Sequence, residues 1–352
     1  MKRILLLLLG LLLLALLLFI IWPSPIDPEA WTPPKAPELT GQYQPNDKLA
    51  NVDILFEGQC DKCEDVAIDS MGRIYGGQLN GDIVEFANGG RRILANTGGR
   101  PLGLHFDQGK NLIIADAGAG LLSLDVNTGQ LTTLVDEYEG KKMIFVDDLE
   151  IAKDGTIYFS DASTKWSFAH STTDILEGRG NGRLYAYYPN TKQTKLLLDD
   201  LRFANGIAVA HDQSYVLVNE TGRYRTHRYW LTGAKKGQSD LFIENLPGFP
   251  DGISQGLDGL YWIALVSPRQ QALDDIASNI FMKNLIAKLP AAAQPAAVHY
   301  GFVLGVDGNG QVQYNLQDPK GGFAEITSIQ QFGGDIYLGS LYEDKIAKYS
   351  LN

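Results

Sequence analysis

The sequence predicts an all-β fold, a six-bladed β-propeller, on the basis of an internal repeat. A short apolar strand, a turn containing Asp or Gly, and a second strand rich in Ile, Tyr and Leu recur along the chain, as in "DLEIAKDGTIYFSD". The six copies start at Asp65, Gly103, Asp148, Gly206, Gly252 and Ile326. Most intervals are close to the roughly 40–50 residues of a four-stranded blade, so six copies indicate six blades.

The ends of the repeat array and its longest interval need separate explanations. A first strand near residues 52–56 is placed to complete the last blade and close the ring. The longest interval carries an insert, residues 269–297, in which apolar residues such as Ile276 and Ile280 follow helical spacing. We expect one or two helices over one face, serving as a packing element, a lid or a membrane-surface contact. No helical pattern alternates with the strands, which argues against a βαβ fold.

The N-terminus predicts a membrane anchor. Lys2 and Arg3 precede an unbroken apolar run, residues 4–22, close to the roughly 20 residues that cross a bilayer as a helix. No small-residue cleavage pattern follows, which favours an uncleaved signal anchor over a cleaved signal peptide. The two positive charges place the N-terminus in the cytoplasm and the propeller in the periplasm or exterior. We expect an anchor in residues 1–22, a Pro-rich linker in 23–50 and the propeller in 51–352.

Charge and cysteine content narrow the function classes. The formal net charge is −11, which argues against a nucleic-acid partner because such a partner requires a basic surface. Cys60 and Cys63 form a single C-x-x-C, without the second pair of a structural zinc site. In an oxidising compartment we expect a local disulfide, with free thiols as the alternative and redox catalysis less favoured than either.

Acidic and amide side chains precede the first strand of several repeats. In a propeller these first strands surround the central channel, so residues at their equivalent ends converge on one axis. Four of five such positions carry an oxygen ligand, namely Glu64, Asp147, Asn205 and Asp251. Each alone is an ordinary turn former, as in Asp251-Gly252. Their coincidence in four repeats indicates a site for a hard cation, and carboxylate and amide oxygens suit Ca²⁺.

Several longer motifs resemble the strictosidine-synthase-like family, and within it the adipocyte plasma membrane-associated protein group. They include "RPLGL", "IADA", "FVDDL", "IYFSDASTKW", "LRFANGI", "LFIENLPGFPDGI" and "YWIAL". The resemblance runs from about Glu64 to the C-terminus, and the family also has an N-terminal membrane anchor. The chain is more distantly similar to the paraoxonases and to the regucalcin and gluconolactonase group, all of which are six-bladed propellers.

The resemblance implies a calcium ion at one end of the channel, held by the same four residues. Asp147 stands where the family usually has Asn, and Gly252 where paraoxonases have a further Asn ligand. The paraoxonase pattern also implies a second calcium at Asp65 and Asp148, with a carbonyl near Leu104. The regucalcin-like relatives use one ion, so one and two ions both remain open.

The reaction that fits such an ion is hydrolysis of a carboxylic ester or lactone, because Ca²⁺ polarises a carbonyl group. The catalytic His pair of paraoxonases falls on Leu102 and Asp116, so we expect Asp116 or Asp147 to act as the general base. Strand alternation is expected to direct His105 away from the channel. Strictosidine-synthase condensation is not supported, because Thr327 stands at the position of its catalytic Glu.

Rim aromatics suggest an apolar substrate pocket, although each also suits an inter-blade core. The residues expected to line it are Phe145, Trp166, Phe203 and Phe249. Two function classes follow: a membrane-anchored, calcium-dependent ester or lactone hydrolase, or a non-catalytic propeller that calcium only stabilises and that acts as a tethered binding or scaffold protein. The fold alone does not decide between them.

Overall fold

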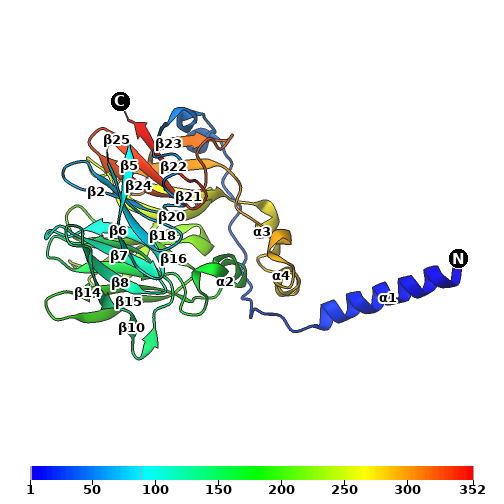
Figure 1. Ribbon diagram of the computed structural model, residues 1–352. Coiled ribbons are helices and arrows are strands. Elements are labelled where there is room, and N and C mark those ends of the chain that lie inside the picture. Colours follow the sequence, from blue (N-terminus) through cyan, green and yellow to red (C-terminus); the bar gives the residue numbers. More distant parts are fainter. Residues whose placement is uncertain (1, 88, 352) are drawn as a thin grey trace.

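The computed structural model describes residues 2–87 and 89–351 and shows six four-stranded antiparallel sheets arranged around a central axis (Figure 1). The first blade consists of β2 (Val66–Ile68), β3 (Ile74–Gly77), β4 (Asp82–Ala87) and β5 (Gly90–Asn96). The second consists of β6 (Arg100–Phe106), β7 (Asn111–Ala117), β8 (Gly120–Asp125) and β9 (Gln130–Val135). The third blade consists of β12 (Val146–Ile151), β13 (Ile157–Asp161), β14 (Gly182–Tyr188) and β15 (Gln193–Leu201). The fourth consists of β16 (Ala204–Val209), β17 (Tyr215–Glu220), β18 (Arg225–Trp230) and β19 (Ser239–Ile243). The fifth blade is β20–β23, with strands Gly248–Gln255, Tyr261–Pro268, Gly301–Val306 and Val312–Asp318.

The sixth blade closes the ring, as the sequence predicted. It combines β24 (Ile326–Phe332), β25 (Asp335–Ser340) and β26 (Ile346–Ser350) with β1 (Asp53–Leu55) from the other end of the chain. β1 and β26 are antiparallel, and Ile54 is paired with Ala347. This pairing joins the two ends of the propeller and covers what would otherwise be a free strand edge.

The blades pack face to face through apolar side chains. β16 and β17 are buried at every position, and Val216 and Val218 pack in the core that joins the third blade to the fourth. The innermost strands β2, β6, β12, β16, β20 and β24 contact one another in sequence around the axis. The sheet faces therefore meet neighbouring blades, and the free edges of the innermost strands face the channel.

Short helices cover one end of the propeller (Figure 1). The insert contains two of them, α3 (Gln271–Ile276) and α4 (Ile280–Ala287), in agreement with the expected one or two helices. A third, α2 (Ser171–Glu177), lies between β13 and β14 and contacts α4. A two-stranded hairpin, β10 (Glu137–Tyr138) and β11 (Lys141–Lys142), leads into the third blade. Single 3-10 turns occur at Gly41–Tyr43, Lys48–Asn51, Phe168–His170, Thr221–Arg223 (η4) and Ala291–Ala293.

The N-terminal helix α1 (Lys2–Ile21) projects away from the propeller and is long and apolar enough to cross a membrane (Figure 1). Residues 23–50, expected as a Pro-rich linker, do more than span a gap, because they bury Ile26, Tyr43 and Leu49 against the propeller. The Glu29 amide donates to the carbonyl of Glu177 at the end of α2. Long-range packing of this kind leaves no periodic signal in the sequence.

Cys60 and Cys63 are joined by a disulfide and are both buried in the apolar core between the first and sixth blades. Among the described residues no cysteine is free.

Candidate metal centre

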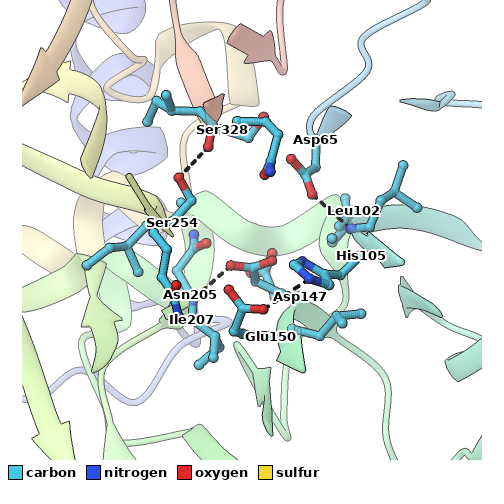
Figure 2. Close-up of a pocket in the computed structure, with 18 of the residues that line it drawn as sticks. Asp65, Leu102, His105, Asp147, Glu150, Asn205, Ile207, Ser254 and Ser328 are labelled. Atoms are coloured by element: carbon cyan, nitrogen blue, oxygen red, sulfur yellow. Dashed lines mark hydrogen bonds and ion pairs between the residues drawn. The ribbon is translucent and has the colours of Figure 1, made fainter. Parts of the chain in front are cut away.

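A cavity of about 460 Å³ lies along the channel and is lined by residues in or flanking the innermost strands of all six blades. The structure brings the four expected calcium ligands, Glu64, Asp147, Asn205 and Asp251, to this one cavity. Each is at most 7% exposed. Figure 2 shows Asp147 and Asn205 pointing into the cavity from neighbouring blades.

A β-bulge in the innermost strand explains how these side chains reach the channel. Pairing to the next strand shifts register between Val146 and Leu149 in β12, and at the equivalent places in β6, β16, β20 and β24. A bulge leaves residues unpaired and re-aims their side chains. Asp147, Asn205 and Asp251 lie within these bulges, which sequence alternation alone does not reveal.

The glycines that follow Asn205 and Asp251 are required by the neighbouring blade. A Cβ atom at residue 206 would lie 2.5 Å from the carbonyl oxygen of Asp251, and one at residue 252 would lie 2.3 Å from that of Thr327. Contacts this short with backbone atoms are not tolerated. The adjoining strand therefore excludes any side chain at residue 252, where paraoxonases carry a further ligand.

Burial and mutual repulsion shape the electrostatics of the site. Burial, followed by the negative charge of Glu64, raises the pKa of Asp147 and of Asp251 well above the usual range. Burial also raises the pKa of Glu64 to about 7, although the positive charge of Arg100 opposes this shift. Carboxyl groups that raise one another's pKa attract a cation, because an ion neutralises the shared charge.

Arg100 is a residue of this site that the sequence reasoning missed. Its Nη2 atom lies 3.8 Å from Glu64 Oε2, and the residue is 5% exposed. Arg100 also donates to the carbonyl oxygens of Lys62 and Gly77, which holds it between the first two blades. The sequence feature that could have pointed to Arg100 is its place as the first residue of the motif "RPLGL". Glu64 Oε2 itself has no hydrogen-bond partner in the described part of the chain.

Asp65 and Asp148 join neighbouring blades through backbone amides. Asp65 Oδ2 accepts from the Leu104 amide at 2.8 Å, and Asp148 Oδ2 accepts from the Ile207 amide at 2.7 Å. These contacts connect the first blade to the second and the third blade to the fourth. Both residues line the same cavity as the four candidate ligands. These half-buried carboxylates therefore have polar partners without a second ion.

The four candidate ligands suit calcium by their chemistry, but their side chains are not spaced as they would be around a bound ion. Across residues 2–87 and 89–351, no three His, Cys, Asp or Glu side chains are arranged closely enough to hold a metal ion. The fit to calcium rests instead on the chemistry of the donors: three buried carboxylates, one amide, and an unpaired oxygen on Glu64.

A second cavity, of about 470 Å³, lies beneath the covering helices. Phe203 and Phe249, two of the four expected pocket aromatics, line it together with Trp31 and Tyr224. Asp251 lines both cavities. Asp251 therefore lies between the carboxylate cluster in the channel and a largely apolar chamber.

The other two pocket aromatics line neither cavity. Phe145 is packed in a buried cluster, 5.3 Å from Phe203 between ring centroids. Trp166 donates its indole N–H to Glu177 at 2.8 Å and so anchors α2.

Asp116 also lies outside both cavities. Its Oδ1 atom accepts from the amides of Arg100 and Ala119, which shapes the start of β6, and the residue is fully buried. Burial raises the pKa of Asp116. Of the two carboxylates expected as general base, Asp147 is the one that the structure places in the channel.

His105 differs from the sequence expectation, because it lines the channel cavity. Its Nε2 atom lies 3.2 Å from Glu150 Oε1, as Figure 2 shows. Both faces of a propeller strand pack against neighbouring blades. The alternation of side chains along the strand therefore determines which neighbouring blade a residue faces, and it does not distinguish channel residues from exterior residues.

The fold and the site together define a six-bladed propeller with an acidic channel, of the architecture found in gluconolactonases and regucalcin. A gluconolactonase from Xanthomonas campestris superposes with a TM-score of 0.63 at 16% identity, covering 94% of this chain and 99% of that one. Regucalcin from Agrobacterium tumefaciens, described as a calcium-binding protein, superposes with a TM-score of 0.60 at 15% identity, covering 84% and 92%. At such identities the likeness concerns the fold.

Sequence comparison gives the family. Residues 147–234 match strictosidine synthase, and residues 41–86 match the N-terminal region of strictosidine-synthase-like proteins. Adipocyte plasma membrane-associated protein of Rattus norvegicus is 34% identical over 352 residues, covering 93% of each chain. The chain belongs to the strictosidine-synthase-like family that includes the adipocyte plasma membrane-associated proteins.

Proposed function

We propose that the protein is a membrane-anchored, calcium-dependent hydrolase of carboxylic esters or lactones. One observation carries the proposal: Asp251 belongs both to the buried carboxylate cluster and to the wall of an apolar cavity. A substrate in the apolar cavity would thus meet the proposed metal ligands at Asp251. Ester and lactone groups are uncharged and suit an apolar cavity that has a few polar groups at one end.

The residues divide into three roles in this proposal. Glu64, Asp147, Asn205 and Asp251 would hold Ca²⁺. When bound, the ion supplies polarisation of the substrate carbonyl and stabilises negative charge that develops on its oxygen. Asp147 would accept the proton of the attacking water, and Phe203 and Phe249 would exclude bulk water from the apolar side.

The proposed anchor would hold the site at a membrane surface. We propose that α1 spans the membrane with its N-terminus in the cytoplasm and the propeller in the periplasm or exterior, because Lys2 and Arg3 flank its short side. Lys288, just beyond α4, donates to the carbonyls of Phe19 and Ile20 at the end of α1. The end of α4 thus lies beside the point where the chain leaves α1.

The test uses the full chain in lipid nanodiscs, with phenyl acetate and a lactone panel, in calcium and after chelation. We expect turnover that needs calcium and that falls at least about 100-fold in Asp251→Asn, which preserves side-chain shape. Asp258→Asn, an exposed turn residue of the same hairpin, is the matched control and should keep full activity. Calcium binding without turnover of any substrate would favour the non-catalytic propeller, and wild-type protein that binds no calcium would refute the site.

A further inference from the structure

Two buried cations line the apolar cavity without a carboxylate partner. Lys283 of α4 is 4% exposed and Arg223 of η4 is 8% exposed, and both contribute to the cavity wall. Within the described residues, neither forms an ion pair with an acidic side chain within 4.0 Å. A buried charge is ordinarily paired, because leaving water is costly for an ion. Two such charges on one cavity wall are typical of a site that binds an anion.

The two cations are neighbours and are held in place by backbone carbonyls. Lys283 Nζ donates to the carbonyl oxygens of Glu29 at 2.8 Å and Glu177 at 3.1 Å. Arg223 Nη2 donates to the carbonyl of Gly178 at 3.2 Å, and its guanidinium lies 4.3 Å from the centroid of Trp31. These contacts leave donors unused on both groups, since an ammonium carries three N–H groups and a guanidinium five.

Nearby carboxylates are already engaged by other groups. Glu29 accepts from Arg202 with both oxygens, and Glu177 accepts from Lys165 at 2.6 Å and from Trp166. Burial, and then the neighbouring Arg223, lower the pKa of Lys283 to about 8, so the ammonium remains mostly protonated at neutral pH. The cavity thus keeps two positive charges available to a ligand.

Charge is distributed unequally over this cavity. Of its acidic residues, Asp251 lies in the bulge of β20 and Glu325 immediately precedes β24, whereas Lys283 and Arg223 come from α4 and η4. Leu273 and Phe249 are among the apolar residues that complete the wall. A ligand that matches this distribution of charge has an oxyanion at the end of the cavity formed by α4 and η4, and an apolar body directed toward the channel.

We propose that the second cavity binds amphipathic anions, an apolar chain ending in a carboxylate or phosphate, with the oxyanion on Lys283 and Arg223. A guanidinium and an ammonium together match the geometry and charge of either group. The inference concerns binding and does not depend on hydrolysis. If hydrolysis also occurs, the same cations would favour substrates that carry an anionic group remote from the scissile bond.

The test measures binding of octanoate, octyl phosphate and 1-octanol to the full chain in phosphatidylcholine nanodiscs, by calorimetry against empty nanodiscs and in the presence of chelator. We expect the wild type to bind at least one of the two anions about tenfold or more tightly than the alcohol, as a lost charge-assisted contact predicts. The relative affinity of octanoate and octyl phosphate identifies the preferred head group. Equal binding of the alcohol and both anions to the wild type overturns the proposal, whatever the variants do.

Lys283→Met should abolish the preference for the anion while keeping an unbranched apolar side chain, and Lys288→Met, in the same insert but outside the cavity, should retain it. Thermal unfolding of each variant establishes that it is folded. A folded Lys283→Met that keeps the full preference also overturns the proposal. Because calcium is chelated throughout, failure of this test is separate from failure of the hydrolase proposal.

Discussion

The carboxylate of Asp148, in the third blade, accepts a hydrogen bond of 2.7 Å from the backbone amide of Ile207, in the fourth. Asp65 makes the equivalent contact with the Leu104 amide between the first and second blades. These acidic residues stand beside the proposed calcium ligands, so the same dipeptides, Glu64-Asp65 and Asp147-Asp148, supply one candidate ligand and one inter-blade contact each.

Removing an inter-blade contact should destabilise the propeller. We expect Asp148→Ala to lower the free energy of unfolding by about 1–3 kcal/mol, because the buried Ile207 amide loses its acceptor. Asp148→Asn keeps an acceptor oxygen and should cost less. Thermal unfolding with chelator present checks both, and an alanine variant as stable as the asparagine variant would contradict the contact's role.

Asp147→Asn should separate charge repulsion from metal binding. In metal-free protein the substitution removes one carboxylate from a cluster in which burial and then Glu64 raise the pKa of Asp147. We therefore expect a gain in unfolding free energy of about 1 kcal/mol after chelation, together with a smaller stabilisation by added calcium. Melting temperatures measured with and without calcium test this. A variant that is less stable than wild type under chelation would be inconsistent with repulsion among these residues.

The bulge glycine at residue 252 should not accept a side chain. We expect Gly252→Ala to destabilise the protein by about 1–3 kcal/mol, because its Cβ atom would lie 2.3 Å from the Thr327 carbonyl oxygen. Gly308→Ala is the control, since the nearest atom to its added Cβ is 3.9 Å away. Urea unfolding of the two variants gives the comparison, and equal stabilities would show that the strands can separate.

Acid should weaken the fourth blade through Glu220. Burial would raise the pKa of this carboxyl, but hydrogen bonds from His227 and Arg225 outweigh it and hold the pKa at about 2. A folded-state pKa below the unfolded value of 4.5 contributes stability above that pH, and the contribution disappears as the pH falls toward 2.

We accordingly expect Glu220→Gln to lose about 3 kcal/mol of unfolding free energy at neutral pH. Its difference from wild type should shrink as the pH falls from 4.5 toward 2. Unfolding measured by circular dichroism across this range is the check. A difference that stays constant with pH would show that the ionised carboxylate does not matter.

The sequence by itself determined the repeating unit and the composition of the candidate site. Each blade carries its own strand pattern and turn residues, which are local properties, and equivalent positions of a closed ring must meet at its axis. For this reason the six blades, the closing strand near residues 52–56 and the convergence of Glu64, Asp147, Asn205 and Asp251 on one cavity could be predicted without coordinates.

Tertiary structure decided everything that depends on which surfaces meet. The β-bulges that re-aim Asp147 and Asp251 depend on how two strands of one blade pair. The contact of His105 with Glu150 and the place of Arg100 beside Glu64 arise between neighbouring blades. The apolar cavity needs several separate segments to close around it, among them the N-terminal segment, α2, η4, the insert and the innermost strands. No single stretch of sequence predicts this cavity, because the contacts that stabilise it form between segments distant in sequence and involve charges that become neighbours only in the folded protein.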